Sequence, residues 1–574
     1  MEGKITTVFD LETADADLMY TGGHRGDFVR LAGAMDVGGA TPVTSAPDQL
    51  FLEQLLRADV LTGHNVQRFD IPALARHYQT DSWELARKTV DTLVLARLAD
   101  PPGARGQKPW SEPGYYSLDA VAARLGVADT REHGKGLLDE LASRYGGLDR
   151  IPVQDPEYRA YLRDDLHEQA AVYAALLPSL DAYARREMHV AAIQSRMTLN
   201  GWRIDTTLLE RRVLAEQQRQ QEALEELHAV YGLPERGRKN PLGTKAGKQW
   251  FEGGLTALGL TVPRTPRGGV SISGDALTAL RVHQADGSTA ARVLDLMLVC
   301  AGVTAKYAEI AKFVVGDRVY AGIGQDQASG RWAMTRPSLT NLGKRGAAKV
   351  AQRGVFLPEV DHVLMAFDMD QVDMRGIAGL SQDRAYMALF APGMDAHAEI
   401  AQLVLGDRSR REDAKPIGHG WNYGRGSRAI SDSTGIPLEV CQQFDREMTN
   451  RFPVLCEWRE EIRGIGAAGI LIDNGFGRKM RCDPHRAYTQ APALAGQGSA
   501  RDLMCEGLLR LDPQVHAMLR GVVHDEVVLS VPREQADDVR QHVLDALTFT
   551  WRDVPITAGA SRPGADWAAC YAKG

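Results

Sequence analysis

The feature that most constrains this chain is an apolar strand pattern that ends in acidic residues, and the chain contains it twice. Near the N-terminus, the run ITTVFDLET carries Asp10 and Glu12. Further along, Asp368 stands in VLMAFDMDQ, where the strand pattern gives way to a helical one. Successive side chains of a strand point to opposite faces, so Asp10 and Glu12 share one face. Because such carboxylates repel each other unless a cation lies between them, the pattern indicates an α/β fold with metal-binding strand ends.

Two further acids and a tyrosine extend the first of these sites. Asp70 follows GHNVQRF, and Asp165 lies four residues after Tyr161 in YLRDD, which puts both side chains on one helix face. Four carboxylates supply hard oxygen ligands for Mg²⁺ or Mn²⁺, and a tyrosine hydroxyl can orient an attacking water. Each residue alone is better explained as a solvated acid, a helix cap or a core aromatic. Their ordered occurrence, with Asp91 in DTLVLARL between them, favours a hydrolytic two-metal site.

The segments FDLET, HNVQRFD and YLRDD resemble the three motifs of the DEDD-type 3′-to-5′ exonucleases. The tyrosine is similar to that of the Tyr subgroup, because the other subgroup carries a histidine where this chain has Ala160. The resemblance implies an RNase H-like domain at residues 1–190. The catalytic residues that it implies are Asp10, Glu12, Asp70, Tyr161 and Asp165, with the four acids as metal ligands.

A second pair of acids is predicted at the other strand end. The segment VVHDEVVL indicates a tight hairpin with Asp525 at its turn and Glu526 next to it. If this hairpin pairs with the strand before Asp368, the two aspartates meet at one edge of the sheet. Such a pair could hold two metal ions about 3.5–4 Å apart for nucleotidyl transfer. The alternative is an ordinary turn that contains an aspartate.

Between these acids lies RREDAKPIGHGWNYG, in which cationic and aromatic residues recur at every fourth position. They are Arg411, Lys415, His419 and Tyr423. A helix would align them as one stripe, suited to triphosphate oxygens and to stacking on a base or sugar, although a solvated helix face would have the same pattern. Pro416 removes a backbone donor, and Gly418 and Gly420 lower helix propensity, so we expect a kinked or mobile helix.

The segments VLMAFDMDQ, RREDAKPIGHGWNYG and VVHDEVVL resemble motifs A, B and C of the family A DNA polymerases. Two further segments of that family are similar to SGRWAMTRPSLTNLGKR and QGSARD. The similarity covers nearly the whole chain and implies a right-hand polymerase domain with palm, fingers and thumb. By resemblance, Asp368 and Asp525 bind metal and Glu526 is a nearby catalytic carboxylate. The implied substrate contacts are Arg411, Lys415, His419 and Tyr423 for the nucleotide, Asp373 as the gate against ribonucleotides, and Arg331, Gln371, Arg375, Gln497 and His524 for primer and template.

Two departures from the family pattern affect nucleotide selection. Asp373 is one methylene shorter than the usual glutamate gate, so we expect looser exclusion of ribonucleotides. His419 stands where the family usually has phenylalanine or tyrosine, and it can donate hydrogen bonds as well as stack.

The resemblance divides the chain into an exonuclease domain at 1–190, a thumb region at 191–330, and palm and fingers at 331–574, with the fingers at about 384–475. A chain of 574 residues has room for about three to five domains, which agrees with this α/β multidomain organisation. In the thumb region we expect one long exposed helix from Ser195 to about Tyr231, followed by a basic loop over 235–274.

The mean charge argues against the function that the motifs imply. Lys and Arg total 67 against 74 for Asp and Glu, and the net charge of −7, taken alone, is not typical of nucleic-acid binding. The basic residues are concentrated, however, and a mean charge does not describe their positions. The candidate phosphate-contacting segments are 236–267, 336–353, RSRR from Arg408, and 478–486.

The implied enzyme is a template-directed DNA polymerase with a proofreading exonuclease and Mg²⁺, or Mn²⁺, at both sites. We expect primer-template DNA, dNTPs and unidentified replisome proteins as partners, and a monomer in the cytoplasm, of the host if phage-encoded. No apolar run approaches the roughly 18 residues that span a bilayer, and no signal-peptide pattern opens the chain. No 5′-nuclease domain is expected, a layout similar to bacteriophage replicative enzymes. A single-subunit RNA polymerase and a degenerate, DNA-binding scaffold are the alternatives.

Overall fold

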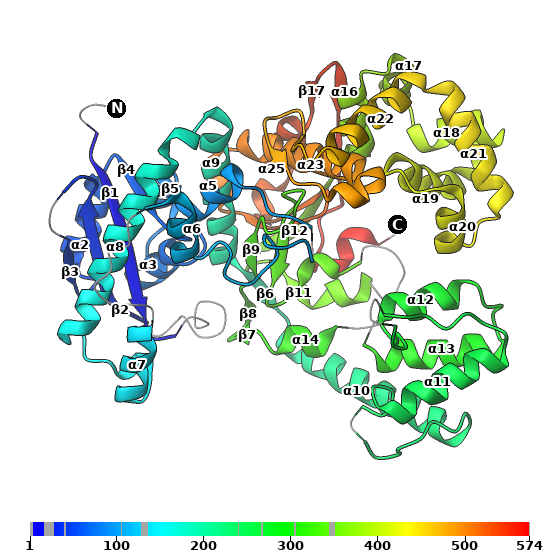
Figure 1. Cartoon of the computed structure of the whole chain (residues 1–574), viewed down its shortest axis with the longest axis horizontal. Helices are drawn as coiled ribbons and strands as arrows, with labels where there is room; N and C mark the ends of the chain where they lie inside the picture. The colour runs from blue at the N-terminus through cyan, green and yellow to red at the C-terminus, as the bar shows by residue number, and fades with distance from the viewer. Residues whose placement is uncertain are drawn as a thin grey trace.

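The computed structural model describes residues 4–15, 28–39, 42–104, 106–127, 136–238, 240–265, 268–302, 306–343 and 350–572. Figure 1 shows an N-terminal region, in blue and cyan, beside a larger body that contains the other helices and strands. None of the helices in these described segments is long and apolar enough to cross a membrane.

A five-stranded sheet forms the centre of the N-terminal region, in the order β3-β2-β1-β4-β5. Its strands are β1 (Thr6–Thr13), β2 (Val29–Asp36), β3 (Val43–Ser45), β4 (Val60–Gly63) and β5 (Thr89–Asp91). β1 pairs antiparallel with β2 and parallel with β4. Most residues of β1 are buried, as expected for a central strand whose two faces are covered.

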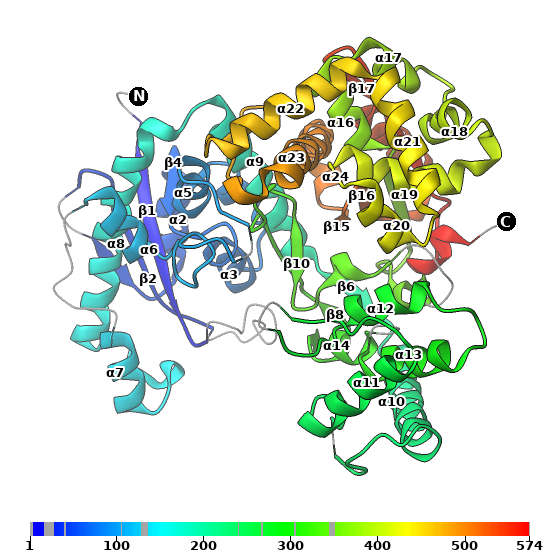
Figure 2. The same ribbon diagram turned by 45° about the vertical axis from the view of Figure 1, so that its right-hand side comes forward.

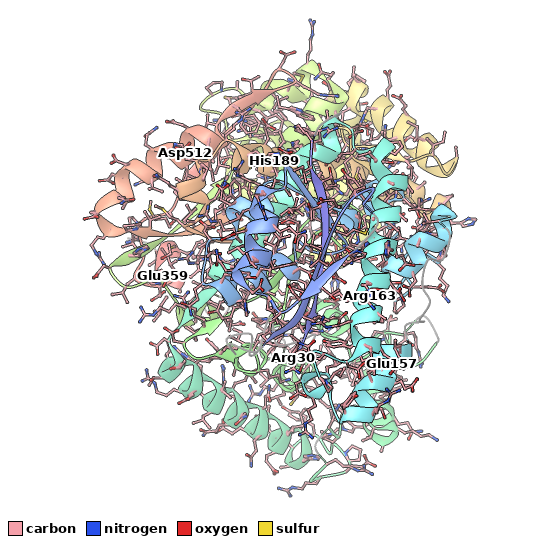
Figure 3. The ribbon with its side chains drawn as sticks, turned by 90° about the vertical axis from the view of Figure 1, so that its left-hand side faces the viewer. Arg30, Glu157, Arg163, His189, Glu359 and Asp512 are labelled. Carbon is pink, nitrogen blue, oxygen red and sulfur yellow. The ribbon has the colours of Figure 1, made fainter. Side chains whose placement is uncertain are left out.

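Seven described helices surround this sheet. They are α2 (Gln49–Arg57), α3 (Asp70–Tyr78), α4 (Trp83–Ala86), α5 (Thr92–Ala99), α6 (Leu118–Leu125), α7 (Gly136–Tyr145) and α8 (Pro156–Leu176). α8 packs on β1 and β2, and Figure 3 shows Arg163 on this helix near Arg30 on the neighbouring strand. The fully buried side chains of Val8, Leu162 and Leu166 fill the space between them. This packing holds the acidic end of β1 against α8.

The helix α9 (Ala182–Asn200) leads from the N-terminal region into the larger body, and the expected domain boundary at residue 190 falls inside it. The expectation of one long helix from Ser195 to Tyr231 is wrong. The strand β6 (Trp202–Ile204) separates α9 from α10 (Thr206–Ala229). Gly201 makes the turn with a φ of 57°, and a Cβ there would lie 2.8 Å from the Val319 oxygen. The residues on both sides of β6 follow a helical pattern, so this short strand between them could not be recognised in the sequence.

A buried ion network fixes α9 to the larger body. Glu187 is fully buried and accepts hydrogen bonds at 2.6 Å from both Arg501 and Arg478. The Tyr183 hydroxyl donates to Asp502 at 2.6 Å. Because removing one member of a buried charged network leaves the others unpaired, such a network strongly disfavours separation of the parts that it joins.

α10 belongs to a helical lobe at the lower right of Figure 1. The other helices there are α11 (Lys245–Ala257), α12 (Gly274–Val282), α13 (Thr289–Cys300) and α14 (Tyr307–Ala311). The expectation of a loop over 235–274 is therefore wrong in part. Thr244 caps α11 by accepting from the Gly247 amide, and the helix buries Phe251 and Leu255. The N-cap and the apolar positions of α11 were not recognised in the sequence, because the glycines of this segment indicated a loop.

Short strands connect this lobe to the centre of the molecule. They are β7 (Val314–Val315), β8 (Arg318–Val319), β9 (Gly322–Gly324), β10 (Ala333–Thr335) and β11 (Phe356–Leu357). One sheet has the order β11-β6-β8-β7, and β9 pairs with β10.

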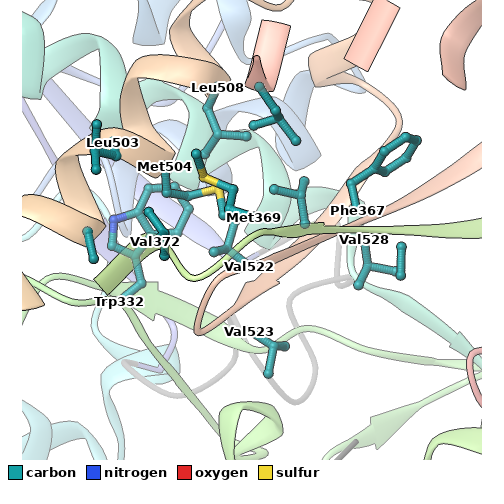
Figure 4. Close-up of a cluster of buried hydrophobic side chains, with 14 of the residues drawn as sticks. Trp332, Phe367, Met369, Val372, Leu503, Met504, Leu508, Val522, Val523 and Val528 are labelled. Carbon is teal, nitrogen blue, oxygen red and sulfur yellow. The ribbon is translucent and has the colours of Figure 1, made fainter. Parts of the chain in front are cut away.

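The centre of the larger body is a four-stranded sheet in the order β15-β16-β12-β19. Its strands are β12 (His362–Met369), β15 (Leu519–Val523), β16 (Glu526–Pro532) and β19 (Ala558–Ala560). The helix α23 (Ala487–Leu509) covers part of it. Figure 4 shows this core, in which Phe367 and Val528 come from the strands and Leu503 and Met504 from α23. The sheet is thus a rigid, apolar support for its polar strand ends.

The remaining helices gather at the upper right of Figure 1 and beside the central sheet. They are α16 (Val372–Ser381), α17 (Arg384–Met387), α18 (Ala396–Leu405), α19 (Arg411–Asn422), α20 (Ser427–Thr434), α21 (Leu438–Arg451), α22 (Pro453–Ala467), α24 (Pro513–His516) and α25 (Ala536–Leu547). The hairpin strands are β13 (Ile472–Asp473), β14 (Lys479–Met480), β17 (Phe549–Trp551) and β18 (Val554–Ile556).

Candidate functional site

Four carboxylates gather where β1, α3 and α8 meet. We call Asp10, Glu12, Asp70 and Asp165 the N-terminal acid cluster. One carboxylate oxygen of each of Asp10, Glu12 and Asp165 lies within 4.8 Å of the other two. Asp70, the first residue of α3, accepts a hydrogen bond from the Leu11 amide at 3.1 Å. The structure therefore brings together the four acids that the sequence singled out.

The N-terminal acid cluster is electrostatically unfavourable by itself. Burial, together with the charges of Asp10, Asp165 and Asp70, raises the pKa of Glu12 well above its usual value. Burial and the Asp10 charge raise the pKa of Asp70 in the same direction. A cation held by these hard oxygen donors would offset both effects, so the donor set fits a divalent metal ion.

Neighbouring residues hold these acids in place. The Asp91 carboxylate caps α5 by accepting from the Leu93 amide, and it also accepts from the amides of Asn65 and Gln67. Asp91 therefore fixes the loop that leads into α3. The side chain of Tyr161 lies on α8 one turn before Asp165, and it is buried.

A second pair of acids lies at the edge of the central sheet. We call Asp368 and Asp525 the strand-end site. β12 and β16 pair antiparallel, with Asp368 opposite Glu526. The turn between β15 and β16 contains His524, at a φ of 61°, and Asp525. The Met369 amide donates to the Asp525 backbone oxygen at 2.9 Å, which fixes the turn beside Asp368. The hairpin and the strand pairing expected from the sequence are thus observed.

Glu526 differs from these aspartates because it is fully enclosed and paired with protein groups. Arg353 donates to Glu526 Oε1 at 2.8 Å, and the Tyr571 hydroxyl donates to the same oxygen at 2.5 Å. The Arg353 guanidinium also lies 4.0 Å from the centroid of the Trp567 ring. Glu526 therefore joins the central sheet to the C-terminal segment of the described chain.

Asp373, the expected gate, lies in the first turn of α16 and is paired with an arginine. Arg331 Nη2 donates to Asp373 Oδ1 at 2.5 Å. Burial and the Asp373 charge raise the pKa of Tyr423 well above its usual value. The rings of His419 and Tyr423 meet edge to face with centroids 4.8 Å apart. These four residues, which the sequence assigned to substrate contact, form one group.

The expected basic stripe lies on α19, which is one helix across Pro416. Its glycines allow close packing: a Cβ at Gly420 would lie 3.0 Å from the Ile430 side chain on α20. Arg411 Nε donates to Asp395 Oδ2 at 2.7 Å, and Asp395 caps α18 through the His397 amide. Arg411 is therefore held by a carboxylate in this structure.

Two further residues of the larger body, His397 and Arg375, have informative surroundings. His397 was not singled out, yet burial and the positive charges of Lys415 and Arg411 lower its pKa to about 4, which places it among the expected triphosphate ligands. The sequence could not relate His397 to the basic stripe by residue spacing, because His397 lies on α18 and the stripe lies on α19. Arg375 is 5% exposed, and its Nε and Nη1 donate to the backbone oxygens of Asp370 and Pro555.

Three of the predicted primer and template contacts line two depressions. Arg331 and His524 line a pocket of about 150 Å³. Gln497 lines a larger groove that faces the N-terminal region. Gln371, the residue before α16, places its side-chain nitrogen 3.5 Å from Asp395.

Several basic residues that we expected to contact phosphate are used in ion pairs. Arg478 is 6% exposed and paired with Glu187, so its expected role is wrong. Arg236 and Arg264 pair with Glu225 and Glu252. Five basic residues of the expected segments lie outside the described residues: Lys239, Arg267, Lys344, Arg345 and Lys349.

Asp368 and Asp525 lie at the ends of central strands; Asp525 interacts electrostatically with Arg331, and Arg331 interacts with His419 of α19. Two such carboxylates could hold the two metal ions of a nucleotidyl-transfer site. The sequence profile of DNA polymerase family A matches residues 243–569, which is more than half of the chain. The chain therefore belongs to DNA polymerase family A.

Individual relatives agree with this family. The DNA polymerase of Mycobacterium phage D29 is 25% identical over 500 residues, which cover 82% of this chain and 77% of the phage protein. DNA polymerase I of Aquifex aeolicus is 24% identical, covering 85% of this chain and 84% of that protein. The match to the thermostable DNA polymerase I of Thermus filiformis, at 27% identity, covers 78% of this chain but 54% of that protein.

The fold also has a solved counterpart. The POL domain of Pol1 from M. smegmatis, described as a complex with DNA primer-template and dNTP, superposes with a TM-score of 0.73. The match covers 99% of this chain and 96% of that chain at 19% sequence identity. At this identity the likeness establishes the mixed α/β polymerase fold.

Proposed function

We propose that this chain is a template-directed, DNA-dependent DNA polymerase with a 3′-to-5′ proofreading exonuclease. We assign the polymerase activity to the strand-end site, because the hydrogen bond between the Met369 amide and the Asp525 backbone oxygen holds two aspartates together. Arg331 interacts electrostatically with Asp525 and with His419 of the cationic helix α19. The M. smegmatis structure contains a DNA primer-template and dNTP, which supports the same substrates here. We assign the exonuclease activity to the N-terminal acid cluster.

Both groups of acids fit Mg²⁺, or Mn²⁺ in its place, because carboxylate oxygens are hard ligands. Asp368 and Asp525 would hold metal for synthesis, and the N-terminal acid cluster would hold it for hydrolysis. Such ions, when bound, activate an attacking oxygen and stabilise the charge that develops on phosphorus. Glu526 supports the sheet beneath Asp368 through its bonds to Arg353 and Tyr571.

The chain's own side chains would select and orient the substrates. Arg411 and Lys415 bind the triphosphate, and Arg411 must first leave Asp395. His419 and Tyr423 contact the base and sugar, while Asp373 stands at the position that excludes a ribose hydroxyl. Arg331, Gln371, Arg375, Gln497 and His524 contact primer and template. In the exonuclease, Tyr161 orients the attacking water.

We further propose the division into exonuclease (1–190), thumb (191–330), and palm and fingers (331–574, with fingers at about 384–475). The similarity to the phage D29 polymerase supports a role in phage-type DNA replication in a host cytoplasm.

Two substitutions test the assignment of separate sites. Asp525→Ala should abolish primer extension and preserve primer degradation, whereas Asp10→Ala should do the opposite. The assay follows a primer with a mismatched 3′ end in Mg²⁺, with and without dNTPs. Loss of both activities from either folded variant would contradict the two-site proposal.

The alternatives give different results in the same assay. Efficient extension with rNTPs in place of dNTPs would indicate an RNA polymerase. Degradation without any extension of a matched primer would indicate a scaffold in which the exonuclease alone is active.

A further inference from the structure

A pocket of about 150 Å³ lies beside the turn that contains His524, and its lining is rich in hydrogen-bond donors. Its polar lining includes the cations Arg331 and Arg501, the indole of Trp332, and the side-chain amides of Gln327 and Asn341. No aspartate or glutamate is among the described residues that line it. A cavity of this volume can hold one molecule about the size of benzene. The pocket is therefore suited to a small group that accepts hydrogen bonds.

Two residues of this lining bring buried donors to the pocket. Trp332 and Arg501 are 8% and 5% exposed. Trp332 Nε1 and the Nε and Nη2 atoms of Arg501 have no hydrogen-bond partner within the described chain. Figure 4 shows the Trp332 ring against Val372 and Met504, which also line the pocket. Because a buried donor without an acceptor costs free energy, these three nitrogens favour the binding of an acceptor from outside the chain.

The Nε and Nη2 atoms of Arg501 form one edge of its guanidinium group. The other terminal nitrogen, Nη1, donates to Glu187 at 2.6 Å and also binds Asp502. An arginine edge with two parallel N–H groups matches two oxygens of a phosphate or a carboxylate. The geometry of this donor pair therefore suits an oxyanion.

The buried network to which Arg501 belongs contains more cations than buried anions. Two fully buried carboxylates, Glu187 and Asp502, bind the arginines of the network. These arginines are Arg186, Arg478 and Arg501. A further acid, Glu506, is partly exposed and lies 3.7 Å from Arg186. Since buried charges are stable when they are paired, an anion at Arg501 would balance the inner part of the network.

An unpartnered indole nitrogen does not by itself indicate an anion site. Trp202 Nε1 is also buried without a hydrogen-bond partner in the part of the chain that the structure describes. The Trp202 ring packs against Phe356 and Trp567, with ring centroids 5.4 Å and 4.8 Å apart, and it does not line the pocket. Trp332 differs because it shares its pocket with a buried guanidinium group.

We propose that this pocket binds inorganic phosphate, with the Trp332 indole and the Nε and Nη2 atoms of Arg501 as hydrogen-bond donors. A phosphate ion is small enough for a pocket of this volume, and its charge balances the network that joins α9 to α23. The site goes beyond the proposed polymerase and exonuclease functions, because the bound anion takes part in no reaction. It stabilises the attachment of α9 to the larger body.

Phosphate binding is measured by isothermal titration calorimetry in EDTA, with chloride to keep the ionic strength constant. Trp332→Phe keeps an aromatic ring and removes the N–H donor, so it should bind phosphate about tenfold more weakly than the wild type. Trp202→Phe is the matched control, because it removes an unpartnered indole nitrogen outside the pocket, and it should bind phosphate as the wild type does. Phosphate should also raise the Tm of the wild type and of Trp202→Phe more than the Tm of Trp332→Phe.

Failure of the wild type to bind phosphate, or equal affinities of Trp332→Phe and Trp202→Phe, would overturn the proposal. Binding that is lost in Lys415→Ala and unchanged in Trp332→Phe would assign the phosphate to α19 instead. Primer-template DNA is the second probe. Weaker binding of DNA by Trp332→Phe, with unchanged binding of phosphate, would assign the pocket to nucleic acid. None of these measurements requires catalysis, so failure of the proposed function leaves the test of the pocket intact.

Discussion

The carboxylates of the N-terminal acid cluster and the two acids next to the strand-end site, Glu526 and Asp373, have opposite electrostatic surroundings. In the cluster, burial and other carboxylates raise the pKa values of Glu12 and Asp70. Around the strand-end site, acids are paired with arginines: Glu526 with Arg353, and Asp373 with Arg331. Carboxylates therefore repel one another in the N-terminal acid cluster, whereas Glu526 and Asp373 stabilise the fold through their arginine partners.

This difference separates function from stability within one chain. Acids that repel one another and are placed for a cation are costly to the folded protein, as expected of groups selected for activity. Acids with arginine partners hold the surrounding elements together, and their removal leaves a buried charge. The following experiments test this contrast.

The largest effect is expected from Asp165→Asn, which removes one charge from the N-terminal acid cluster. Degradation of single-stranded DNA in Mg²⁺ should fall by about 10³-fold or more. Unfolding in EDTA should show that the variant is more stable than the wild type, because repulsion is relieved. Asp164→Asn, on the same helix but outside the cluster, is the control for both measurements. A less stable Asp165→Asn would contradict the contrast.

The next largest effect is expected at the arginine that pairs with Glu526. Arg353→Ala leaves this buried carboxylate without its cation and should lower the free energy of unfolding by about 3–5 kcal/mol. Tyr571→Phe, which removes one hydrogen bond to the same oxygen, should cost about 1 kcal/mol. Urea titration measures both. Arg562→Ala, an exposed residue in the same segment, should change stability by less than about 0.5 kcal/mol.

A pH titration of stability tests the surroundings of His397, which lies near the positive charges of Lys415 and Arg411. His397 has a pKa of about 4 in the folded protein, among Lys415, Arg411, Asp395 and His419, against 6.5 as its ordinary value. The unfolded chain then binds the proton more readily. The contribution of neutral His397 to the free energy of unfolding is therefore fully present above about pH 6.5 and is lost as the pH falls toward 4. The full contribution is about 3 kcal/mol. His397→Gln should remove this part of the dependence, and an unchanged slope between pH 7 and 5 would contradict it.

The smallest effect is expected at the Asp373 gate, where a longer acid restores the usual family residue. Asp373→Glu should lower incorporation of rNTPs relative to dNTPs by about tenfold, and Asp373→Ala should raise it. Single-nucleotide kcat/KM values for the two substrates measure the ratio. The same ratio in all three proteins would show that the acid paired with Arg331 is structural.

The sequence predicted the elements that carry the acids because their signals are local. The strand before Asp368, the helix after it and the turn at Asp525 each follow from a few neighbouring residues. In contrast, β6 and α11 were missed, because a strand of three residues and a glycine-containing helix have weak periodicity.

The pairing of acids with arginines could not be predicted in this way. Arg353 and Glu526 are 173 positions apart, and Arg331 and Asp373 are 42 apart. A basic segment indicates phosphate binding in general, yet Arg478 is buried against Glu187 on α9, a contact that depends on the packing of distant helices. His397 was missed for the same reason.

The helix α9 has a consequence for the distance between the N-terminal acid cluster and the larger body. Met188 on this helix contacts the Asp91 amide beneath the N-terminal acid cluster, while its neighbour Glu187 is bonded to α23 and to Arg478. A helix of this length spans about 28 Å and resists bending. The N-terminal acid cluster and the larger body are therefore kept at a constant separation. Under the proposed function, the outcome of a misincorporation would be decided by competing rates, those of strand melting and of the next addition, rather than by movement of one site toward the other.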